Sequence, residues 1–339
     1  MKKKLNKYFK YSAIIGMLVT LTCCNQGSPY IKTEGMIWNT VYHITYKGPQ
    51  HLKDSIMPIL NEVGKSLSVF DKNSLVTQLN NSISVCPDSH LIKVYDTSKR
   101  ISRSSHGNFD PTVAPLIDAW GFGIGHVPTK DTLELDSVLI FIGIEKTHRE
   151  DSIIFKEDIR TKFNFSAIAK GYGCDEIGEM LRRNGVKDFM IEIGGEITLG
   201  GKSPSGGPWK IAIDKPVEGN NPGEETIVIL NLTDCGIATS GNYRNYRMEG
   251  SEKIAHTISP ITGRPIISDI LSVSVISSTC MEADAIATAC MAGSINEAKE
   301  LLNETKSEGL IITTDSIFET PGFSRFILEA WEPGRRDRN

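Results

Sequence analysis

The sequence lacks a surplus of basic residues, and it has no cysteine motif and no internal repeat. Its 37 Lys and Arg are outnumbered by 41 Asp and Glu, which gives the 339-residue chain a formal net charge of −4. A protein that binds nucleic acid needs a basic face, so this balance argues against such a partner. The five cysteines beyond residue 24 show no CxxC pair and no metal-ligand spacing. Their odd number favours buried free thiols over disulfides.

The sequence also lacks a hydrophobic run long enough to cross a bilayer. The stretch YSAIIGMLVTLTCC ends at Cys24, and its apolar run of about a dozen residues falls short of the ~20 that a membrane helix needs. Five lysines and no acid precede Cys24, which is typical of an export signal. The ending LTCC resembles a bacterial lipobox with Cys24 as the lipidated residue; cleavage before Cys23 and a plain secretory signal are the alternatives.

These features predict three segments: a lipoprotein signal peptide over 1–23, a tether over 24–33 and a domain over 34–333. We expect the mature protein to be exported and lipid-anchored to a membrane of the bacterial cell envelope. The Pro- and Gly-rich breaks at 201–208 and 216–223 are short enough to be loops. No linker therefore divides the domain.

The pattern of apolar residues predicts a single α+β domain with mixed, largely antiparallel sheets and packed helices. Apolar residues at helical spacing predict helices over 54–70, 90–105, 165–185, 280–292 and 294–304. Short alternating or β-branched runs, bounded by Gly, Pro or Asn, predict strands within 31–48, 186–201, 209–216, 225–232, 253–260, 270–278 and 309–314.

The helix predicted over 280–292 consists almost wholly of small apolar residues, yet it carries a carboxylate, Asp284. Thr288 lies one helical turn later and therefore on the same face. An unpaired buried charge is very costly. Asp284 therefore needs a partner inside the fold.

Three motifs each allow two interpretations. FDPTVAPLIDAWGFG (109–123) is either a rigid loop that buries its aromatic residues or a wall that stacks on a flat ligand ring. IEIGGE (191–196) is either a tight turn or a close approach of backbone to a ligand. ATSGNYRNY (238–246) is either a polar turn or part of a binding site. The residues alone do not separate these alternatives.

Two single residues are also ambiguous. Lys170 follows Asn164, a helix-capping residue type, and stands beside glycines that let a phosphate approach backbone; otherwise it is a solvent-facing lysine. His256 precedes a Pro-Gly turn and is either structural or a general base.

Taken in order, these motifs resemble those of the ApbE-type FAD:protein FMN transferases. The series is Asn164-x-x-Ala-x-x-Lys170, Gly-Gly-Glu, Ser-Gly-Asn-Tyr, His-x-x-x-Pro-x-Thr-Gly and Asp-x-x-x-Thr, together with Trp-Gly-Phe-Gly at 120–123. The resemblance spans about residues 34–315. It implies an ApbE-like fold and an enzyme that uses FAD and Mg²⁺ to attach FMN, through a phosphoester bond, to a Thr or Ser hydroxyl of a target flavoprotein, releasing AMP.

Two other activities remain open on the same resemblance. One is an FAD pyrophosphatase, in which water replaces the acceptor hydroxyl and the products are FMN and AMP. The other is a non-catalytic flavin-binding lipoprotein. The acceptors of the family are often subunits of membrane electron-transfer complexes, which fits an exported and membrane-anchored catalyst.

The resemblance also implies roles for particular residues. The Mg²⁺ ligands would be the Asp284 carboxylate, the Thr288 hydroxyl and the backbone carbonyl of Ala167, an all-oxygen set that suits this cation. The catalytic residues would be Asp284 and His256, the latter as base. The implied flavin contacts are Met36, Phe70, Asn108, Phe109, Asp110, Asn164, Lys170 and His256. The chain departs from the family at Asn164, where Asp is usual, and at Phe70, where Tyr is frequent.

Overall fold

The structure is a computed structural model, and it describes residues 29–123, 132–217, 225–242, 246–249, 252–255 and 257–330. Two residues singled out by the sequence, Cys24 and His256, lie outside these ranges. The tether expected over 24–33 overlaps the first strand, which begins at Tyr30 and pairs with its neighbour from that residue onward. No helix within the described ranges has the length and apolar character needed to cross a membrane.

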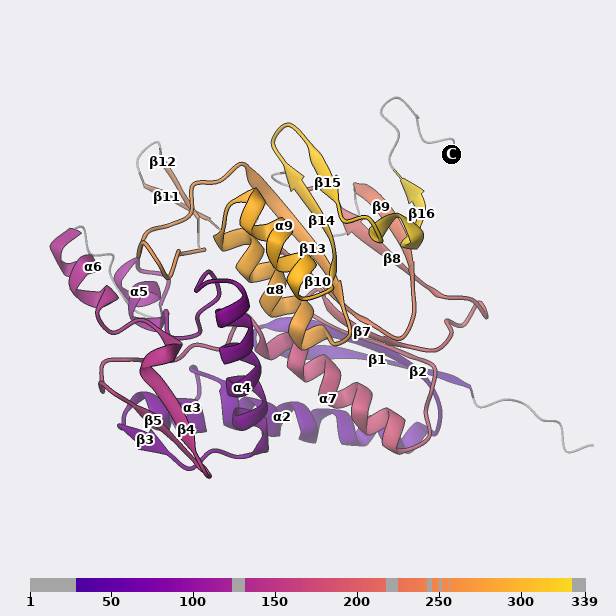
Figure 1. The fold of residues 1–339 in the computed structure, drawn as a ribbon. Helices are drawn as coiled ribbons and strands as arrows, with labels where there is room; N and C mark the ends of the chain where they lie inside the picture. Colours follow the sequence, from indigo (N-terminus) through magenta and orange to yellow (C-terminus); the bar gives the residue numbers. More distant parts are fainter. Residues whose placement is uncertain are drawn as a thin grey trace, which may run out of the picture.

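An eight-stranded sheet forms the centre of the fold (Figure 1). All of its neighbouring strands are antiparallel. In spatial order the strands are β1 (Tyr30–Ile37), β2 (Thr40–Lys47), β6 (Phe189–Ile193), β7 (Glu196–Gly200), β10 (Gly236–Gly241), β13 (Ile270–Ser277), β14 (Glu308–Thr313) and β15 (Ile317–Glu319).

Both faces of the central strands are buried, each against a different layer. Along β10, Ile237 packs against the sheet of β8 (Trp209–Asp214), β9 (Thr226–Leu232) and β16 (Ile327–Ala330), whereas Ala238 packs among the helices. Successive strand residues point to opposite faces, so β10 separates a β layer from an α layer. The predicted α+β class with largely antiparallel sheets is confirmed.

The helices gather mainly on one face of the central sheet (Figure 1). The described helices are α2 (Ile56–Leu67), α3 (Leu75–Asn80), α4 (Ser89–Ser104), α5 (Ala114–Ala119), α6 (Thr132–Leu139), α7 (Ala169–Arg183), α8 (Cys280–Ala292) and α9 (Ile295–Glu304). Two small sheets complete the described fold: β3 (Ser84–Val85), β5 (Ile153–Lys156) and β4 (Thr147–Glu150), and the pair β11 (Tyr246–Glu249) and β12 (Glu252–Ala255).

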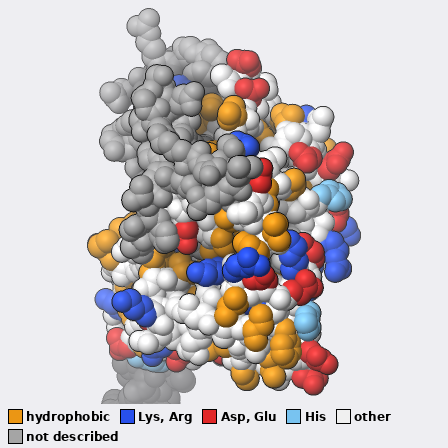
Figure 2. Space-filling model, turned by 90° about the vertical axis from the view of Figure 1, so that its left-hand side faces the viewer, with side chains coloured by type: hydrophobic (Ala, Val, Ile, Leu, Met, Phe, Trp, Pro, Cys, Tyr) orange, Lys and Arg blue, Asp and Glu red, His pale blue; other side chains and the backbone are white. Residues whose placement is uncertain are grey.

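The surface on the side of α5 and α6 carries both signs of charge. Figure 2 shows Lys and Arg side chains interspersed with Asp, Glu and hydrophobic ones over the part that is not grey. No basic field dominates this visible face.

Helices α7 and α8 cross at Gly171, a residue of α7 that has no side chain. A Cβ added to Gly171 would lie 2.3 Å from the backbone oxygen of Cys280, a separation that real Cβ atoms do not show. The glycine therefore lets the first turn of α7 touch the first turn of α8. This crossing brings Lys170 and Ala167 close to the helix that carries Asp284.

Gly171→Ala is expected to lower the free energy of unfolding by about 1–3 kcal/mol, because the added methyl forces the two helix backbones apart. Thermal unfolding followed by circular dichroism measures this loss. Gly207→Ala is the matched control, since a Cβ at Gly207 meets nothing within 4 Å. An unchanged melting temperature in Gly171→Ala would show that the crossing is not tightly packed.

Candidate functional site

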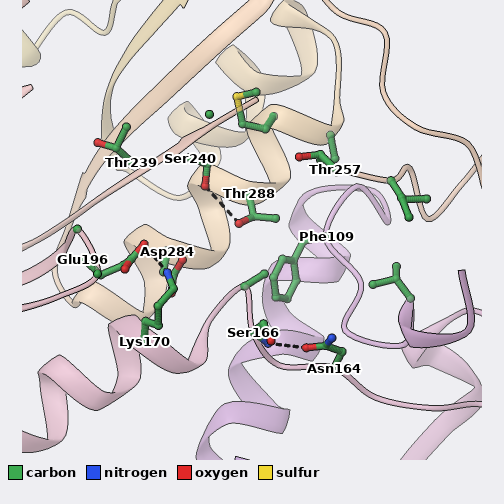
Figure 3. Close-up of a pocket in the computed structure, with 18 of the residues that line it drawn as sticks. Phe109, Asn164, Ser166, Lys170, Glu196, Thr239, Ser240, Thr257, Asp284 and Thr288 are labelled. Atoms are coloured by element: carbon green, nitrogen blue, oxygen red, sulfur yellow. Dashed lines mark hydrogen bonds and ion pairs between the residues drawn. The ribbon is translucent and has the colours of Figure 1, made fainter. Parts of the chain in front are cut away.

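A cavity of about 540 Å³ opens beside the crossing of α7 and α8, and residues of both the α layer and the β layer line it. Figure 3 shows side chains from both helices and from neighbouring strands and loops converging on it. The described segments that contribute to its lining are 108–117, 164–170, 194–196, 212–214, 239–241, 257–260 and 284–292. Segments far apart in the sequence thus meet at one hollow.

Helix α8 presents Asp284 and Thr288 to this cavity. The helix begins at a Thr279 cap, whose side chain accepts a hydrogen bond from the Glu282 amide, and it ends before Gly293. Asp284 is 3% exposed, and both residues line the cavity (Figure 3). The Thr288 hydroxyl shares a hydrogen bond of 3.3 Å with the Ser240 hydroxyl of β10. The predicted shared face of Asp284 and Thr288 is therefore present and points at the cavity.

The start of α7 leaves a backbone carbonyl without a helical partner. The sequence predicts a helix from residue 165, but the regular helix begins at Ala169, after a turn. The amide of Gly171 donates to Oδ2 of Asp284 at 3.1 Å, whereas the next amide along α7 donates to the Ile168 carbonyl. Within the described ranges, no backbone amide donates to the Ala167 carbonyl. That oxygen is free to bind a ligand, and Ala167 lines the cavity.

Lys170 lies between two carboxylates at the floor of the cavity (Figure 3). Its ammonium nitrogen is 2.5 Å from Oε1 of Glu196, the first residue of β7. The other oxygen of Glu196, Oε2, is buried and has no hydrogen-bond partner among the described residues. Burial raises the pKa of Glu196 to about 7, although the charge of Lys170 opposes this shift.

The pKa values of Asp284 and Lys170, which belong to the same cluster, are also shifted. Burial raises the pKa of Asp284, against the opposing effects of the Lys170 charge and the Gly171 amide. Burial acts to lower the pKa of Lys170, but the charges of Asp284 and Glu196 outweigh it and the pKa is raised. Ionisation of both carboxylates beside the one ammonium would leave the cluster with a surplus negative charge. This surplus would be neutralised by a cation in the cavity.

The donor set fits a hard divalent cation that keeps some water ligands. It offers the Asp284 carboxylate, the Thr288 hydroxyl and the free Ala167 carbonyl, all of them oxygens. Across the described ranges, no three His, Cys, Asp or Glu side chains gather as a metal cage. Mg²⁺ is usually held by one or two carboxylates together with waters and substrate phosphates rather than by a full protein cage.

The implied flavin contacts in segment 108–110 line the cavity. Phe109 is buried and offers a ring to it (Figure 3). Asp110 is also buried, but its Oδ1 accepts from the amide and hydroxyl of Thr112 and its Oδ2 accepts from the Ile144 amide at 2.9 Å. The carboxylate of Asp110 therefore ties the loop that carries Phe109 to the backbone at Ile144.

Asn164 also lines the cavity, and its Oδ1 accepts from the Ser166 amide at 2.9 Å (Figure 3). It caps the turn before α7 rather than α7 itself, whose N-cap position has no side-chain cap. The capping expected from the sequence is present, displaced by a few residues. This turn also contains Ala167, which lines the cavity.

Two implied flavin contacts, Met36 and Phe70, are not in the lining of the cavity. Their side chains are 70% and 60% exposed. Met36 and Phe70 remain predicted contacts for the part of the flavin that projects beyond the cavity. Of the alternatives for 109–123, the structure shows packing for Trp120, whose indole nitrogen donates to the Gly263 carbonyl at 2.7 Å, and Phe122 joins the same apolar cluster.

The sequence alone does not single out Glu196 and Ser240 as site residues, although each stands in a motif for which a binding site is one of two interpretations. The structure places both residues in the lining of the cavity. A carboxylate directly after paired glycines was the available signal for Glu196. The link from Ser240 to Thr288 depends on strand β10 lying beside α8, which no local pattern reveals.

The model of the ApbE family matches residues 38–311. The chain is 32% identical over 333 residues to an FAD:protein FMN transferase of Haemophilus influenzae, with 92% of this chain and 95% of the relative covered. It is 34% identical over 290 residues to an FAD:protein FMN transferase of Vibrio cholerae, covering 82% and 85%. The solved flavin transferase ApbE from Vibrio cholerae superposes with a TM-score of 0.78 at 30% identity, over 88% of this chain and 99% of that one.

Proposed function

Because the chain belongs to the ApbE family, we propose that it is an FAD:protein FMN transferase. It attaches the FMN moiety of FAD to a Thr or Ser hydroxyl of a target flavoprotein through a phosphoester bond and releases AMP. The observation that carries this proposal is the meeting of Asp284, Thr288 and the free Ala167 carbonyl at one cavity, which Phe109 and Lys170 also line.

The transfer is a displacement at the phosphorus of the FMN half of FAD. The acceptor hydroxyl oxygen forms a bond to this phosphorus, and the bond from the phosphorus to the bridging oxygen breaks. AMP departs with the bonding electron pair on that oxygen, and the hydroxyl proton passes to a base. His256 is our candidate for that base.

The residues that line the cavity have different roles in binding the cation, the diphosphate and the flavin ring. Asp284, Thr288 and the Ala167 carbonyl would hold Mg²⁺, which when bound neutralises the charge of the diphosphate and of the leaving oxygen. Lys170 contributes a fixed positive charge beside Asp284 and is held by Glu196. Asp110 fixes the loop that carries Phe109, so the ring is positioned before a ligand arrives.

Two further expectations accompany this function. We propose that residues 1–23 are removed as a signal peptide and that Cys24 carries a lipid that anchors the domain to a membrane of the cell envelope. The acceptor is then a flavoprotein exposed in the same compartment, in keeping with subunits of membrane electron-transfer complexes.

Co-expression with a candidate acceptor subunit tests the proposal. We expect covalent yellow fluorescence at the position of the acceptor on a denaturing gel, and only when the chain, FAD and Mg²⁺ are all supplied. In a second assay, FAD and Mg²⁺ are incubated without acceptor and AMP is measured. Fast AMP release in that assay would indicate a pyrophosphatase, and tight FAD binding without any turnover would indicate a flavin-binding protein.

A further inference from the structure

A second hollow of about 920 Å³ adjoins the cavity on its outer side. Its walls come from the loop 259–270, the turn between α8 and α9, and the turn between β14 and β15. We call this hollow the outer groove. Asp284, Thr288, Ala167 and Phe109 are not in the lining of the outer groove.

The outer groove and the cavity share a wall. Asn108 and Ala292 line both hollows. The Asn108 side chain reaches the first turn of α9, where its Nδ2 donates to Oε1 of Glu297 at 3.4 Å. A Cβ added to Gly293 would lie 2.8 Å from that Nδ2, so the glycine leaves room for the shared wall. A chain lying in the outer groove thus ends at the mouth of the cavity.

The position of this wall is fixed by helix capping. Ser294 and Glu297 form a capping box at the start of α9, in which Glu297 accepts from the Ser294 amide at 2.7 Å. Capping boxes satisfy the free amides at a helix start and hold the entry of the chain. The inner end of the outer groove is therefore preformed rather than a loose surface turn.

The outer groove carries exposed apolar side chains. Ile267 is fully exposed and Ile261 is 54% exposed, and both line it. Ile317 is also exposed and directly follows Ser316, another lining residue. Exposed apolar side chains that gather beside a hollow are typical of surfaces that bind a partner.

The charges of the outer groove have one sign. Its lining includes Asp269, Asp315 and Glu297 and, among the described residues, contains no Lys, Arg or His. Asp269 and Asp315 are exposed at its rim. A partner with a basic or neutral flank and apolar side chains is complementary to this surface.

We propose that the outer groove binds an extended segment of the acceptor protein and delivers its Thr or Ser hydroxyl past Asn108 into the cavity; this inference rests on the proposed function. FMN transfer to a protein requires that the hydroxyl reach the cavity while the chain around it lies on a contiguous surface. The outer groove provides such a surface. Its isoleucines would contact apolar side chains of the acceptor, and its aspartates would contact basic residues that flank the acceptor hydroxyl.

The test measures steady-state transfer with the acceptor subunit that the full-length wild-type protein flavinylates in co-expression. Two variants perturb the outer groove: Ile267→Glu, and the charge reversal Asp269→Lys with Asp315→Lys. In each, we expect the KM for the acceptor to rise at least about tenfold, as for loss of a contact that matters in a protein interface. The kcat and the Kd for FAD, followed by flavin fluorescence, should change less than twofold.

Ile159→Glu is the matched control, because Ile159 is 53% exposed in the loop after β5 and lies outside both linings. It should leave the KM for the acceptor unchanged. Wild-type transfer with an unchanged KM in both variants of the outer groove would overturn this inference and leave the proposed function standing. Failure of the wild-type protein to flavinylate any acceptor would overturn the proposed function, and this inference with it.

Discussion

Asp284→Ala is expected to lower FMN transfer on the order of a hundredfold or more at low Mg²⁺, because it removes the only carboxylate of the proposed cation site. The remaining ligands, a hydroxyl and a carbonyl, are neutral and hold Mg²⁺ weakly. The measurement is the initial rate of acceptor flavinylation over a Mg²⁺ titration. Higher Mg²⁺ should restore part of the rate if the variant loses affinity for the cation.

Glu282→Gln is the matched control for Asp284→Ala. Glu282 lies on the same helix, two residues earlier, but its carboxylate faces Arg100 and the Ser278 hydroxyl rather than the cavity. We expect its transfer rate and Mg²⁺ dependence to match the wild type. Circular dichroism should show that both variants are folded. Wild-type transfer by folded Asp284→Ala protein would contradict the assignment of Asp284.

Lys170→Met is expected to have the largest effect on stability, because it leaves Glu196 and Asp284 facing each other without a positive charge. Removing one partner of a buried ion pair costs about 3–5 kcal/mol, and we expect about 2–3 kcal/mol here because 31% of the Lys170 side chain is exposed. Chemical denaturation of the metal-free protein measures this loss. Lys93→Met is the control, since Lys93 pairs with Glu176 on the surface.

A double substitution distinguishes the effect of the Lys170 charge on stability from its effect on FMN transfer. Lys170→Met combined with Glu196→Gln removes the pair together, so most of the lost stability should return. Transfer should stay impaired, because the positive charge beside Asp284 is still absent. If Lys170→Met alone were as stable as the wild type, the ammonium would not be what holds the two carboxylates together.

The fold could be predicted wherever the pattern of apolar residues was strong. The helices expected over 280–292 and 294–304 match α8 and α9 within one residue, because each starts at a hydroxyl-bearing cap. The short elements α3, α5, α6 and the sheet of β3, β4 and β5 were not predicted, since runs of two to eight residues carry little periodicity. The strand expected over 253–260 is shorter, with β12 ending at Ala255.

The site was predictable in part from chemistry and in part from the motif order. An acid on an apolar helix marked Asp284, and the spacing to Thr288 placed both on one face. The ApbE-type resemblance is confirmed by the family match and by the relatives. What local sequence could not give was the ion pair of Lys170 with Glu196, which depends on β7 lying beside α7.

The sequence also could not predict that α7 begins only at Ala169. The pattern of residues 165–185 reads as one helix, yet the first turn is broken because the Gly171 amide donates to Asp284 instead of to Ala167. A tertiary hydrogen bond therefore overrides local propensity beside the Ala167 carbonyl, which we propose as a cation ligand.

The central claim is that Asp284, Thr288 and the Ala167 carbonyl hold one divalent cation against the diphosphate of FAD. Crystals grown with FAD and Mn²⁺ in place of Mg²⁺ test it directly, because Mn²⁺ gives an anomalous scattering peak. The account predicts one peak at bonding distance from these three oxygens and from diphosphate oxygens. A diphosphate bound in the cavity with the Mn²⁺ peak elsewhere, or with no peak beside Asp284, would contradict it.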